Sequence, residues 1–363
     1  MTVSQDIGSS SRLRVAHVVI SDAFAGTERY VADLAAEQAR QGCEVLVLGG
    51  DLNAMQKASG CAAVEYFRAE SLTEAFRALR ASRQLDVVHA HLTASEFAAC
   101  TAYPRRGPIV VSTRHIVARR GSTLTGRLAS RWIRKRLDGQ ITPSVYAAGL
   151  VDGQSHVIAT GTPDADFGSH DERVVLVAQR LEADKDTVTA IRAWHTAELW
   201  SQGWELHVAG DGSEAHQLTR LVERLGLANS CRFLGRVSDL PRRIATAGLV
   251  LCSSRSDSFG LVAVEAMAAG AAVVATASGG YLETVGSVAS PALFPPGDHS
   301  AAAREMRRLA TNAEERGRYG ARLREAQRAH FSLPGFASSV IEWYVSRLAA
   351  AGLAQRSYQV GRR

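Results

Sequence analysis

The chain has 363 residues, more than one ordinary domain needs, and its 46% hydrophobic content with only nine prolines argues against a disordered protein. Five scattered cysteines without a CxxC pair argue against a disulfide framework or a zinc–cysteine site and favour a reducing cytosol. No apolar run approaches the roughly 20 residues of a membrane span. We therefore expect a cytoplasmic protein, at most peripheral on the inner face of a membrane. The net charge of +6 suits phosphate or anionic lipid without choosing between them.

The first half alternates short apolar runs with helical patterns. Residues 13–20 predict a buried parallel strand, and a loop containing Gly26 leads into a helix over residues 27–40. Further strands are predicted at 44–48, 62–67, 86–90 and 108–112, with a helix over 71–81 and another near 95–103. Such alternation indicates right-handed βαβ units on a parallel sheet. The loop at Gly26 would point backbone N–H groups toward the carboxyl edge of that sheet, which suits phosphate but also describes a plain strand-to-helix turn.

A basic amphipathic helix is predicted at 124–137. Residues 101–140 contain ten arginines or lysines and one acidic residue, Asp138. Within them Leu128, Trp132 and Ile133 recur at helical spacing, with basic residues around them. The pattern is compatible with a peripheral contact to an anionic membrane, with binding of an anionic acceptor, or with a helix that packs on its own sheet and turns its charges to water.

The chain divides after a segment rich in Gly, Pro and Asp at 160–172, and the strand–helix pattern then starts afresh. We expect an acceptor-side domain over 1–165 and a donor-binding domain over 166–332. The last helix, from 333, carries an apolar stripe that could return to cover the first domain, which would then include 333–363. The predicted fold class is α/β: two Rossmann-like, doubly wound parallel-sheet domains with their carboxyl edges facing across a cleft.

The most informative stretch is residues 254–270, which predict a loop and a helix from about 259 to 269. This helix is apolar nearly all round, so we expect it to be buried, yet Glu265 interrupts it. Asp257 lies just ahead of the helix, where backbone N–H groups favour an anion. Two carboxylates beside an anion site suit a ligand with hydroxyls and phosphate, such as a nucleotide sugar. Alternatively, Asp257 only caps the helix and Glu265 reaches solvent.

Two cations follow a predicted strand of the second domain. Arg180 and Lys185 should lie at the carboxyl edge that also carries Asp257, where they can hold a diphosphate and stabilise its developing charge. The alternative is that both form surface ion pairs with Glu182 or Asp184.

Histidines mark the first domain. His115 follows a strand, at a position to hydrogen-bond a sugar hydroxyl or assist proton transfer, although a structural role is also open. His89 and His91 lie on one face of a strand end, at a spacing that can hold a metal, but no obvious third ligand is near in the sequence. We therefore predict no metal site. The carboxylate pairs at 164–166 and 184–186 lie in turn-rich loops and are interpreted as turn residues.

Taken together, these stretches resemble a known family. SDSFGLVAVEAMAAG, QRLEADK, the GTER loop, TPS and PPGD look like the retaining nucleotide-sugar glycosyltransferases of family 4, which have the GT-B fold. The likeness runs over nearly the whole chain, and its most specific mark is the acidic pair eight residues apart, Asp257 and Glu265.

The resemblance implies that Glu265 accepts hydrogen bonds from the ribose, that Asp257 contacts hydroxyls of the donor sugar, and that Arg180 and Lys185 bind the diphosphate. By the same resemblance His115 is the histidine near the transferred sugar. The donor-binding set that it implies is completed by Gly26, Thr27, Ser258, Phe259, Gly260 and Leu261. The sequence departs from the family at Asp257, where Glu is usual, and at Thr160 and Ala25, where Asn and a second glycine are usual.

The implied reaction transfers a sugar from a nucleotide diphosphate sugar to an acceptor hydroxyl with retention of configuration. The leaving phosphate itself would take the acceptor proton, so neither an enzymic nucleophile nor a metal or other cofactor is required. The acceptor would be a cell-envelope glycan, a lipid-linked molecule or a secondary metabolite, and no nucleic acid is expected as a partner. Two alternatives remain: a non-catalytic GT-B subunit that binds a nucleotide sugar or a partner enzyme, and a dinucleotide oxidoreductase. The second lacks a GxGxxG fingerprint.

Overall fold

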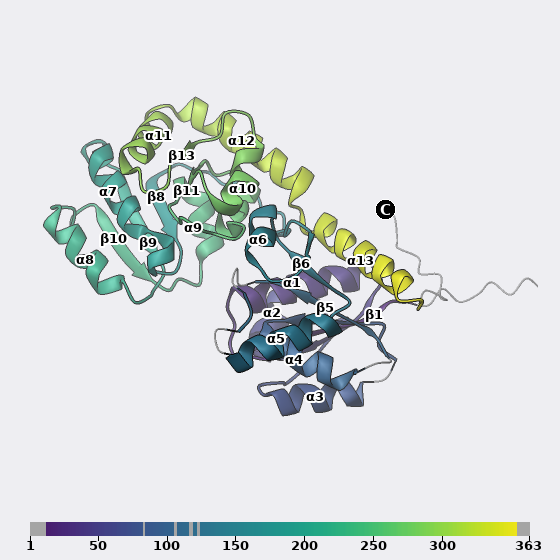
Figure 1. The fold of residues 1–363 in the computed structure, drawn as a ribbon. Helices are drawn as coiled ribbons and strands as arrows, with labels where there is room; N and C mark the ends of the chain where they lie inside the picture. Colours follow the sequence, from purple (N-terminus) through teal and green to yellow (C-terminus); the bar gives the residue numbers. More distant parts are fainter. Residues whose placement is uncertain (1–11, 83, 105–106, 116–118, 122–123, 354–363) are drawn as a thin grey trace, which may run out of the picture. The chain divides into compact units, whose positions relative to one another are not determined.

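The computed structural model of the chain describes residues 12–353 except 83, 105–106, 116–118 and 122–123 (Figure 1). The chain forms two compact units. The first contains the chain up to Pro143, then Ala148–Ile158, and the chain from Leu333 onward; the second contains Ser144–Ala147 and Ala159–Ser332. After the short segment Ser144–Ala147, the chain enters the second unit again at Ala159, which is earlier than the expected boundary at 165.

Hydrogen bonds explain why residues before 165 belong to the second unit. The Glu283 carboxylate accepts from the backbone N–H groups of Val145 and Tyr146 at 2.8 and 2.9 Å. The backbone N–H of Thr162 donates to the carbonyl of Phe331 at 2.9 Å. Both short segments are thus fixed by partners far along the chain, which the composition of the segment at 160–172 could not indicate.

The first unit is a seven-stranded sheet in the order β3-β2-β1-β4-β5-β6-β7, parallel at every pairing. Its strands are β1 Arg14–Val19, β2 Glu44–Leu48, β3 Val64–Phe67, β4 Val87–His91, β5 Ile109–Thr113, β6 Gly139–Thr142 and β7 His156–Val157. Its helices are α1 Gly26–Arg40, α2 Leu52–Ser59, α3 Leu72–Ala81, α4 Thr93–Ala102, α5 Leu124–Arg136 and α13 Leu333–Ala350, while α6 Val145–Leu150 begins in the second unit and ends in the first.

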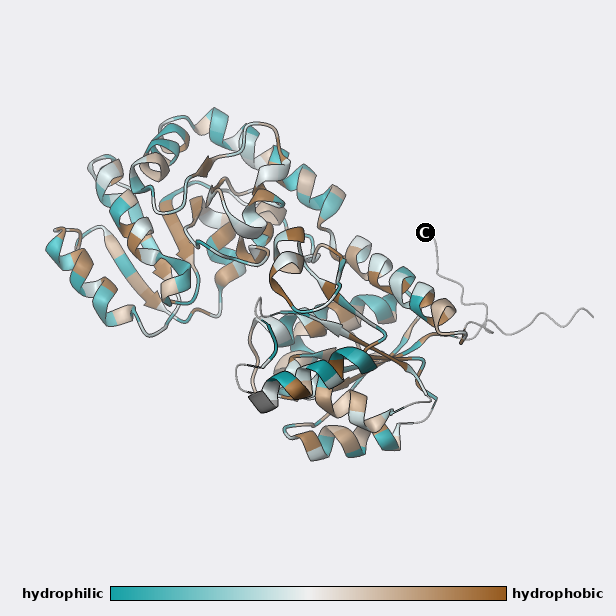
Figure 2. Cartoon of the chain, in the orientation of Figure 1, coloured by the Kyte–Doolittle hydropathy of each residue, from teal (hydrophilic) through white to brown (hydrophobic). Residues whose placement is uncertain are grey.

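Helices cover both faces of this sheet, which explains why every residue of β4 and β5 is buried. One core lies under α1 and α13, and the other under α3 and α4. The apolar stripe of α13, with Phe336, Val340 and Tyr344, is buried in the first of these cores. The expected return of the last helix to the first domain is therefore observed. Figure 2 shows the apolar strands of each sheet beneath helices whose outer faces are hydrophilic.

The second unit repeats the plan with six parallel strands in the order β10-β9-β8-β11-β12-β13. Its strands are β8 Glu172–Ala178, β9 Glu205–Ala209, β10 Cys231–Gly235, β11 Ala247–Cys252, β12 Val273–Thr276 and β13 Leu293–Phe294. Its helices are α7 Thr187–Ala197, α8 Ala215–Arg224, α9 Leu240–Thr246, α10 Leu261–Ala269, α11 His299–Thr311 and α12 Ala313–His330. Four 3₁₀ turns join them: η1 Ala183–Lys185, η2 Leu199–Gln202, η3 Gly279–Leu282 and η4 Val285–Ser287.

The direction of winding reverses between β8 and β11, which lie side by side although two other strands separate them in the sequence. In open parallel sheets, ligands bind outside the carboxyl ends of the strands at such a switch point. The loops that follow β8 and β11 are therefore the part of this unit where a site is expected.

Two predicted elements differ from the structure. The helix expected from about 259 begins at Leu261, because Gly260 adopts φ +82° at the N-cap and a side chain there would lie 2.5 Å from the Tyr281 ring. The strand expected over 288–294 shrinks to β13, because Ser290 has φ +55° and Pro291 offers no N–H to a neighbouring strand.

Candidate functional site

Side-chain hydrogen bonds join the two loops at the switch point of the second sheet. The Ser253 hydroxyl donates to the carbonyl of Lys185 at 3.0 Å, and the Ser254 hydroxyl donates to the carbonyl of Asp184 at 3.0 Å. The Gln179 amide also donates to the Lys185 carbonyl, at 3.0 Å. These bonds hold the backbone around Lys185 against the loop that carries Asp257.

Lys185 and Asp257 form an ion pair, with 2.8 Å between Nζ and Oδ2. The other oxygen of Asp257, Oδ1, accepts from the backbone N–H groups of Phe259 at 3.1 Å and Gly260 at 2.7 Å. Burial alone would raise the pKa of the Asp257 carboxyl, but the charge and hydrogen bond of Lys185, together with the two amides, lower it below its usual value. Asp257 thus caps the turn into α10, as the alternative interpretation foresaw, while a carboxylate's lone pairs leave room for one further donor.

The turn into α10 is packed too tightly for side chains. A Cβ at Gly280 would lie 2.3 Å from the Cα of Phe259, and the Gly280 N–H donates to the carbonyl of Asp257 at 2.9 Å. Close packing of η3 on this turn fixes the direction in which the first amides of α10 point. The site therefore offers a rigid helix N-terminus beside a lysine, which favours an anion.

Glu265 lies one turn into α10, on the same face as Leu261 and Val262. These three residues are half-buried, whereas the remaining residues of the helix are buried. Glu265 therefore lies on the one face of α10 that is only half-buried.

Arg180 behaves differently from Lys185. Its side chain is 68% exposed and its guanidinium lies 3.7 Å from the carboxylate of Asp184. The same carboxylate lies 3.6 Å from Lys185 Nζ, so Asp184 stands between the two predicted cations. Glu182, the other expected partner, instead accepts from Ser213. Arg255, which was not predicted as a site residue, donates to the carboxylate of Asp186 at 2.6 Å.

The phosphate-binding loop predicted at Gly26 in the first unit lies at the start of α1. Gly26 is exposed, and a Cβ added there would meet nothing within 4 Å. Thr27 is half-buried, and Glu28 is buried with its carboxylate accepting from the backbone N–H of Ala25 at 3.0 Å. The protein's own packing therefore does not explain the glycine, and its role in phosphate binding stays a prediction.

His115 follows β5 and is half-buried, with its Nε2 at 3.0 Å from Nδ1 of His91. Burial, with a smaller effect of the Arg114 charge, lowers the pKa of His115 to about 4. The ring is therefore neutral near pH 7 and carries one proton, which it can donate from one nitrogen only.

A third histidine joins the pair that the sequence singled out, which corrects the expectation that no further ligand lies near. His17 on β1 is in register with His89 on β4, and the ring nitrogens of His17, His89 and His91 lie within 4.8 Å of one another. Such a set can in principle bind a cation. However, hydrogen bonds already occupy all six ring nitrogens of the three.

A buried ion cluster lies on the other face of the first sheet and was not predicted. Glu96 accepts from Arg120 Nε and Nη2, both at 2.6 Å, and Arg120 also reaches Asp152 at 3.1 Å. Arg120 is fully buried, so these partners compensate a charge that could not stand alone there.

The basic helix α5 exposes its cations and one apolar side chain. Arg127, Arg131 and Lys135 are exposed, and Leu128 between them is 63% exposed, while Ile133 is buried. Over the part of the chain that the structure describes, none of the helices has the length and apolarity to cross a membrane.

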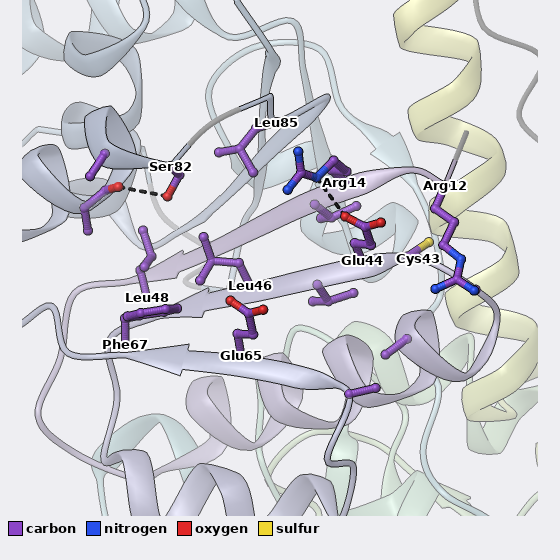
Figure 3. Close-up of a pocket in the computed structure, with 17 residues that line it drawn as sticks. Arg12, Arg14, Cys43, Glu44, Leu46, Leu48, Glu65, Phe67, Ser82 and Leu85 are labelled. Carbon is purple, nitrogen blue, oxygen red and sulfur yellow. Dashed lines mark hydrogen bonds and ion pairs between the residues drawn. The ribbon is translucent and has the colours of Figure 1, made fainter. Parts of the chain in front are cut away.

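A pocket of about 580 Å³ opens beside β1, β2 and β3 in the first unit. Figure 3 shows Arg14 and Glu44 paired at its wall and Leu46, Leu48 and Phe67 on its apolar side. Among the described residues that line it there is none of the predicted site residues.

Comparisons with known proteins agree with this architecture. The family model described as Glycosyl transferases group 1 matches residues 164–326, and the model described as Glycosyltransferase Family 4 matches residues 24–162. Among solved structures, HepE of Anabaena in complex with UDP and glucose has a TM-score of 0.75 at 19% identity, over 92% of this chain and 100% of that one. The same protein in complex with UDP-glucose has a TM-score of 0.75 at 21% identity, with the same coverage.

Curated relatives match over shorter stretches. A D-inositol 3-phosphate glycosyltransferase of Salinispora arenicola is 37% identical over 149 residues, covering 39% of this chain and 32% of that protein. A 2-deoxystreptamine N-acetyl-D-glucosaminyltransferase of Streptomyces fradiae is 29% identical over 241 residues, covering 60% and 56%. The chain spans only 18–56% of the length of the curated relatives that it matches. The family matches over both units, together with the two parallel-sheet units themselves, identify the chain as a GT-B glycosyltransferase of the family 4 type.

Proposed function

We propose that the chain transfers a sugar from a nucleotide diphosphate sugar to an acceptor hydroxyl, with retention of configuration and without a metal. The observation that carries this proposal is the Lys185–Asp257 ion pair at the rigid start of α10, where the second sheet reverses its winding. A cation beside a helix N-terminus suits a diphosphate, and an adjacent carboxylate suits sugar hydroxyls.

The proposed roles follow the positions of the side chains. Lys185 and Arg180 bind the diphosphate, and for Arg180 this requires exchanging Asp184 for the ligand. Glu265, on the half-buried face of α10, accepts from the ribose hydroxyls. Asp257 orients the donor sugar with its remaining acceptor capacity, and the segment from Ser258 to Leu261 supplies backbone amides. From the first unit we assign Gly26, Thr27 and His115 to donor binding.

The proposed reaction needs no nucleophile from the protein. The bond between the anomeric carbon and the diphosphate oxygen breaks, and the acceptor oxygen bonds to the same face of that carbon. The leaving phosphate oxygen takes the acceptor proton. Lys185 and the amides at the start of α10 stabilise the negative charge that develops on the diphosphate.

Slow hydrolysis of the donor is the test, because it requires no knowledge of the acceptor. A thermal-shift panel of nucleoside diphosphates and their sugars first identifies the donor, since a ligand that binds the folded state raises its apparent stability. Glu265→Gln and Lys185→Met should then each reduce binding and hydrolysis by at least tenfold. Glu223→Gln, on the exposed side of α8, is the matched control and should behave as wild type.

Donor binding without hydrolysis or transfer to any acceptor would favour the alternative of a non-catalytic subunit. Failure of every donor in the panel to bind would contradict both interpretations.

A second proposal concerns the acceptor side. We infer that α5 contacts an anionic surface, because Leu128 is exposed among cations on a helix that otherwise packs on its sheet. Such a contact fits a lipid-linked acceptor. The variant Arg131→Glu with Lys135→Glu should lose sedimentation with phosphatidylglycerol vesicles, whereas Arg220→Glu with Arg224→Glu, at the same spacing on α8, should retain it. Equal sedimentation of both double variants would exclude α5 as the contact.

A further inference from the structure

A continuous chain of hydrogen bonds leads from the core of the first unit to His115. It begins at Gln38 on α1, which is fully buried. Its carbonyl oxygen Oε1 lies 2.8 Å from Nε2 of His17. Because a carbonyl oxygen can only accept, the proton of His17 is on Nε2, and Nδ1 of His17 presents a lone pair.

The lone pair on Nδ1 of His17 determines which nitrogen is protonated in the next two rings, His91 and His115. Nδ1 of His17 lies 3.0 Å from Nε2 of His91, so His91 donates from Nε2 and accepts at Nδ1. Nδ1 of His91 lies 3.0 Å from Nε2 of His115, so His115 donates from Nε2. Burial lowers the pKa values of all three histidines, hence each ring carries one proton near pH 7. The remaining nitrogen of His115, Nδ1, is then an acceptor.

The other end of the Gln38 amide directs a second branch. Gln38 Nε2 donates to the hydroxyl of Tyr344 on α13 at 3.4 Å, and this hydroxyl lies 2.6 Å from Nδ1 of His89. Nε2 of His89 in turn lies 2.7 Å from the hydroxyl of Thr113. Each imidazole and hydroxyl in these two branches can change between donor and acceptor when its proton moves. The Gln38 amide cannot, because its oxygen always accepts and its nitrogen always donates.

This second branch ends at a tyrosine that packs against the same imidazole. The Thr113 hydroxyl lies 3.3 Å from that of Tyr30, and the Tyr30 ring stands edge-on to His115 with 4.7 Å between centroids. If the Gln38 amide turned over, both branches would reverse, and Nδ1 of His115 would become a donor.

Metal binding is the competing explanation for the histidine cluster. A cation at His17, His89 and His91 would have to displace ring hydrogen bonds of 2.6–3.0 Å. Among the described residues, no carboxylate joins the three rings to offset a double positive charge in a fully buried site. The hydrogen-bond chain accounts for the same rings without that cost.

We propose that Gln38, acting through His17 and His91, fixes the tautomer of His115 so that its Nδ1 accepts a hydrogen bond from a sugar hydroxyl. Gln38, His17 and His91 are positioning residues, since none of them is placed to touch the ligand itself. The tautomer follows from the hydrogen bonds together with the orientation of the Gln38 amide, while the sugar as the donor to Nδ1 rests on the proposed function.

Long-range ¹H–¹⁵N NMR of histidine-labelled protein tests the tautomer, because it distinguishes a protonated ring nitrogen from one with a lone pair. In the wild-type protein, the signals lost in His115→Gln should identify a ring protonated on Nε2. Gln38→Met removes both the carbonyl acceptor and the amide donor and should give His17, His91 and His115 mixed tautomers. Gln41→Met, at the residue that caps the end of α1 and donates to the carbonyl of Pro334, should leave them unchanged.

Three results would overturn the inference. These are a wild-type His115 protonated on Nδ1, an unchanged His115 tautomer in Gln38→Met, and zinc bound stoichiometrically in the purified protein. The first result requires only the wild-type spectrum. The inference can therefore be tested even if the Gln38→Met protein does not fold.

Donor hydrolysis supplies a separate readout. In Gln38→Met we expect kcat to fall by about tenfold, the effect of one misdirected hydrogen bond, with folding and Gln41→Met activity unchanged. If the wild-type protein hydrolyses no donor, the proposed function fails while the NMR result still decides the tautomer. If hydrolysis is present but equal in Gln38→Met and Gln41→Met, the assigned role of the tautomer fails.

Discussion

Acid should destabilise the first unit through its buried histidines. Burial lowers the pKa values of His17 and His115 from 6.5 to about 4. In the unfolded chain these two histidines therefore become protonated below pH 6.5, whereas in the folded chain they stay neutral down to about pH 4. The contribution of these neutral histidines to the free energy of unfolding is fully present above pH 6.5. It falls as the pH drops from 6.5 toward 4.

The size of the effect follows from the two pKa values. At pH 5 each unfolded histidine gains about 1.5 pH units of protonation free energy over the folded one, at about 1.36 kcal/mol per unit. Each ring then costs about 2 kcal/mol, and the two together about 4 kcal/mol, a large part of the 5–15 kcal/mol that usually holds a domain folded. His89 and His91, whose pKa values burial also lowers, add to the effect in the same direction.

Urea unfolding between pH 8 and pH 5 measures this dependence. Asp257 does not interfere, because its pKa is lowered from 3.8 and it loses its contribution only below that value. The variant His17→Gln keeps hydrogen-bonding groups but does not titrate, so its stability should fall less steeply with acid. His195→Gln, on the exposed side of α7, is the control and should keep the wild-type slope. Equal stability at pH 8 and pH 5 in the wild-type protein would refute the reasoning.

Three substitutions, with Gly317→Ala as a comparison for one of them, test packing and buried charge. Asp257→Asn removes the ion pair and should cost about 2 kcal/mol, seen as a melting temperature about 5 °C lower in calorimetry; an unchanged temperature would mean that the ion pair contributes no net stability. Gly280→Ala places a Cβ 2.3 Å from the backbone of Phe259 and should lower both stability and donor binding, whereas Gly317→Ala, which meets nothing within 4 Å, should stabilise α12 by up to about 1 kcal/mol. Glu96→Gln leaves a buried arginine short of charge and should cost about 3–5 kcal/mol in urea unfolding; a loss below 1 kcal/mol would show that water reaches the cluster.

The fold could be predicted because its signal is local. Apolar runs such as DVVHA, with helical patterns between them, specify buried parallel strands, and these became β4 and its neighbours. The boundary between the units could not be predicted in the same way. It depends on Glu283 capping α6 from more than 130 residues away, and no local pattern records such a partner.

The candidate site was predictable where residues lie next to a strand end. Lys185 and Asp257 came together because β8 and β11 are neighbours, which the winding of a doubly wound sheet implies. The histidine chain was not found, because His17 becomes visible only when the register of β1 on β4 is known. A search for polar residues at matching positions of predicted neighbouring strands would have indicated it.

Asp257 shows why sequence alone left two interpretations open. Its short side chain reaches the amides two and three residues ahead, a local turn that a carboxylate one methylene longer would not form in the same way. One carboxylate can therefore do two things here: its Oδ1 accepts the two amides of the turn, while its Oδ2 holds Lys185 beside the first amides of α10. Because Lys185 is paired with the Asp257 carboxylate, a diphosphate would bind next to an ion pair rather than to an isolated cation. If the proposed function is correct, Asp257 in place of the family's usual Glu holds the diphosphate site more rigidly, and its shorter side chain extends less far toward the donor sugar.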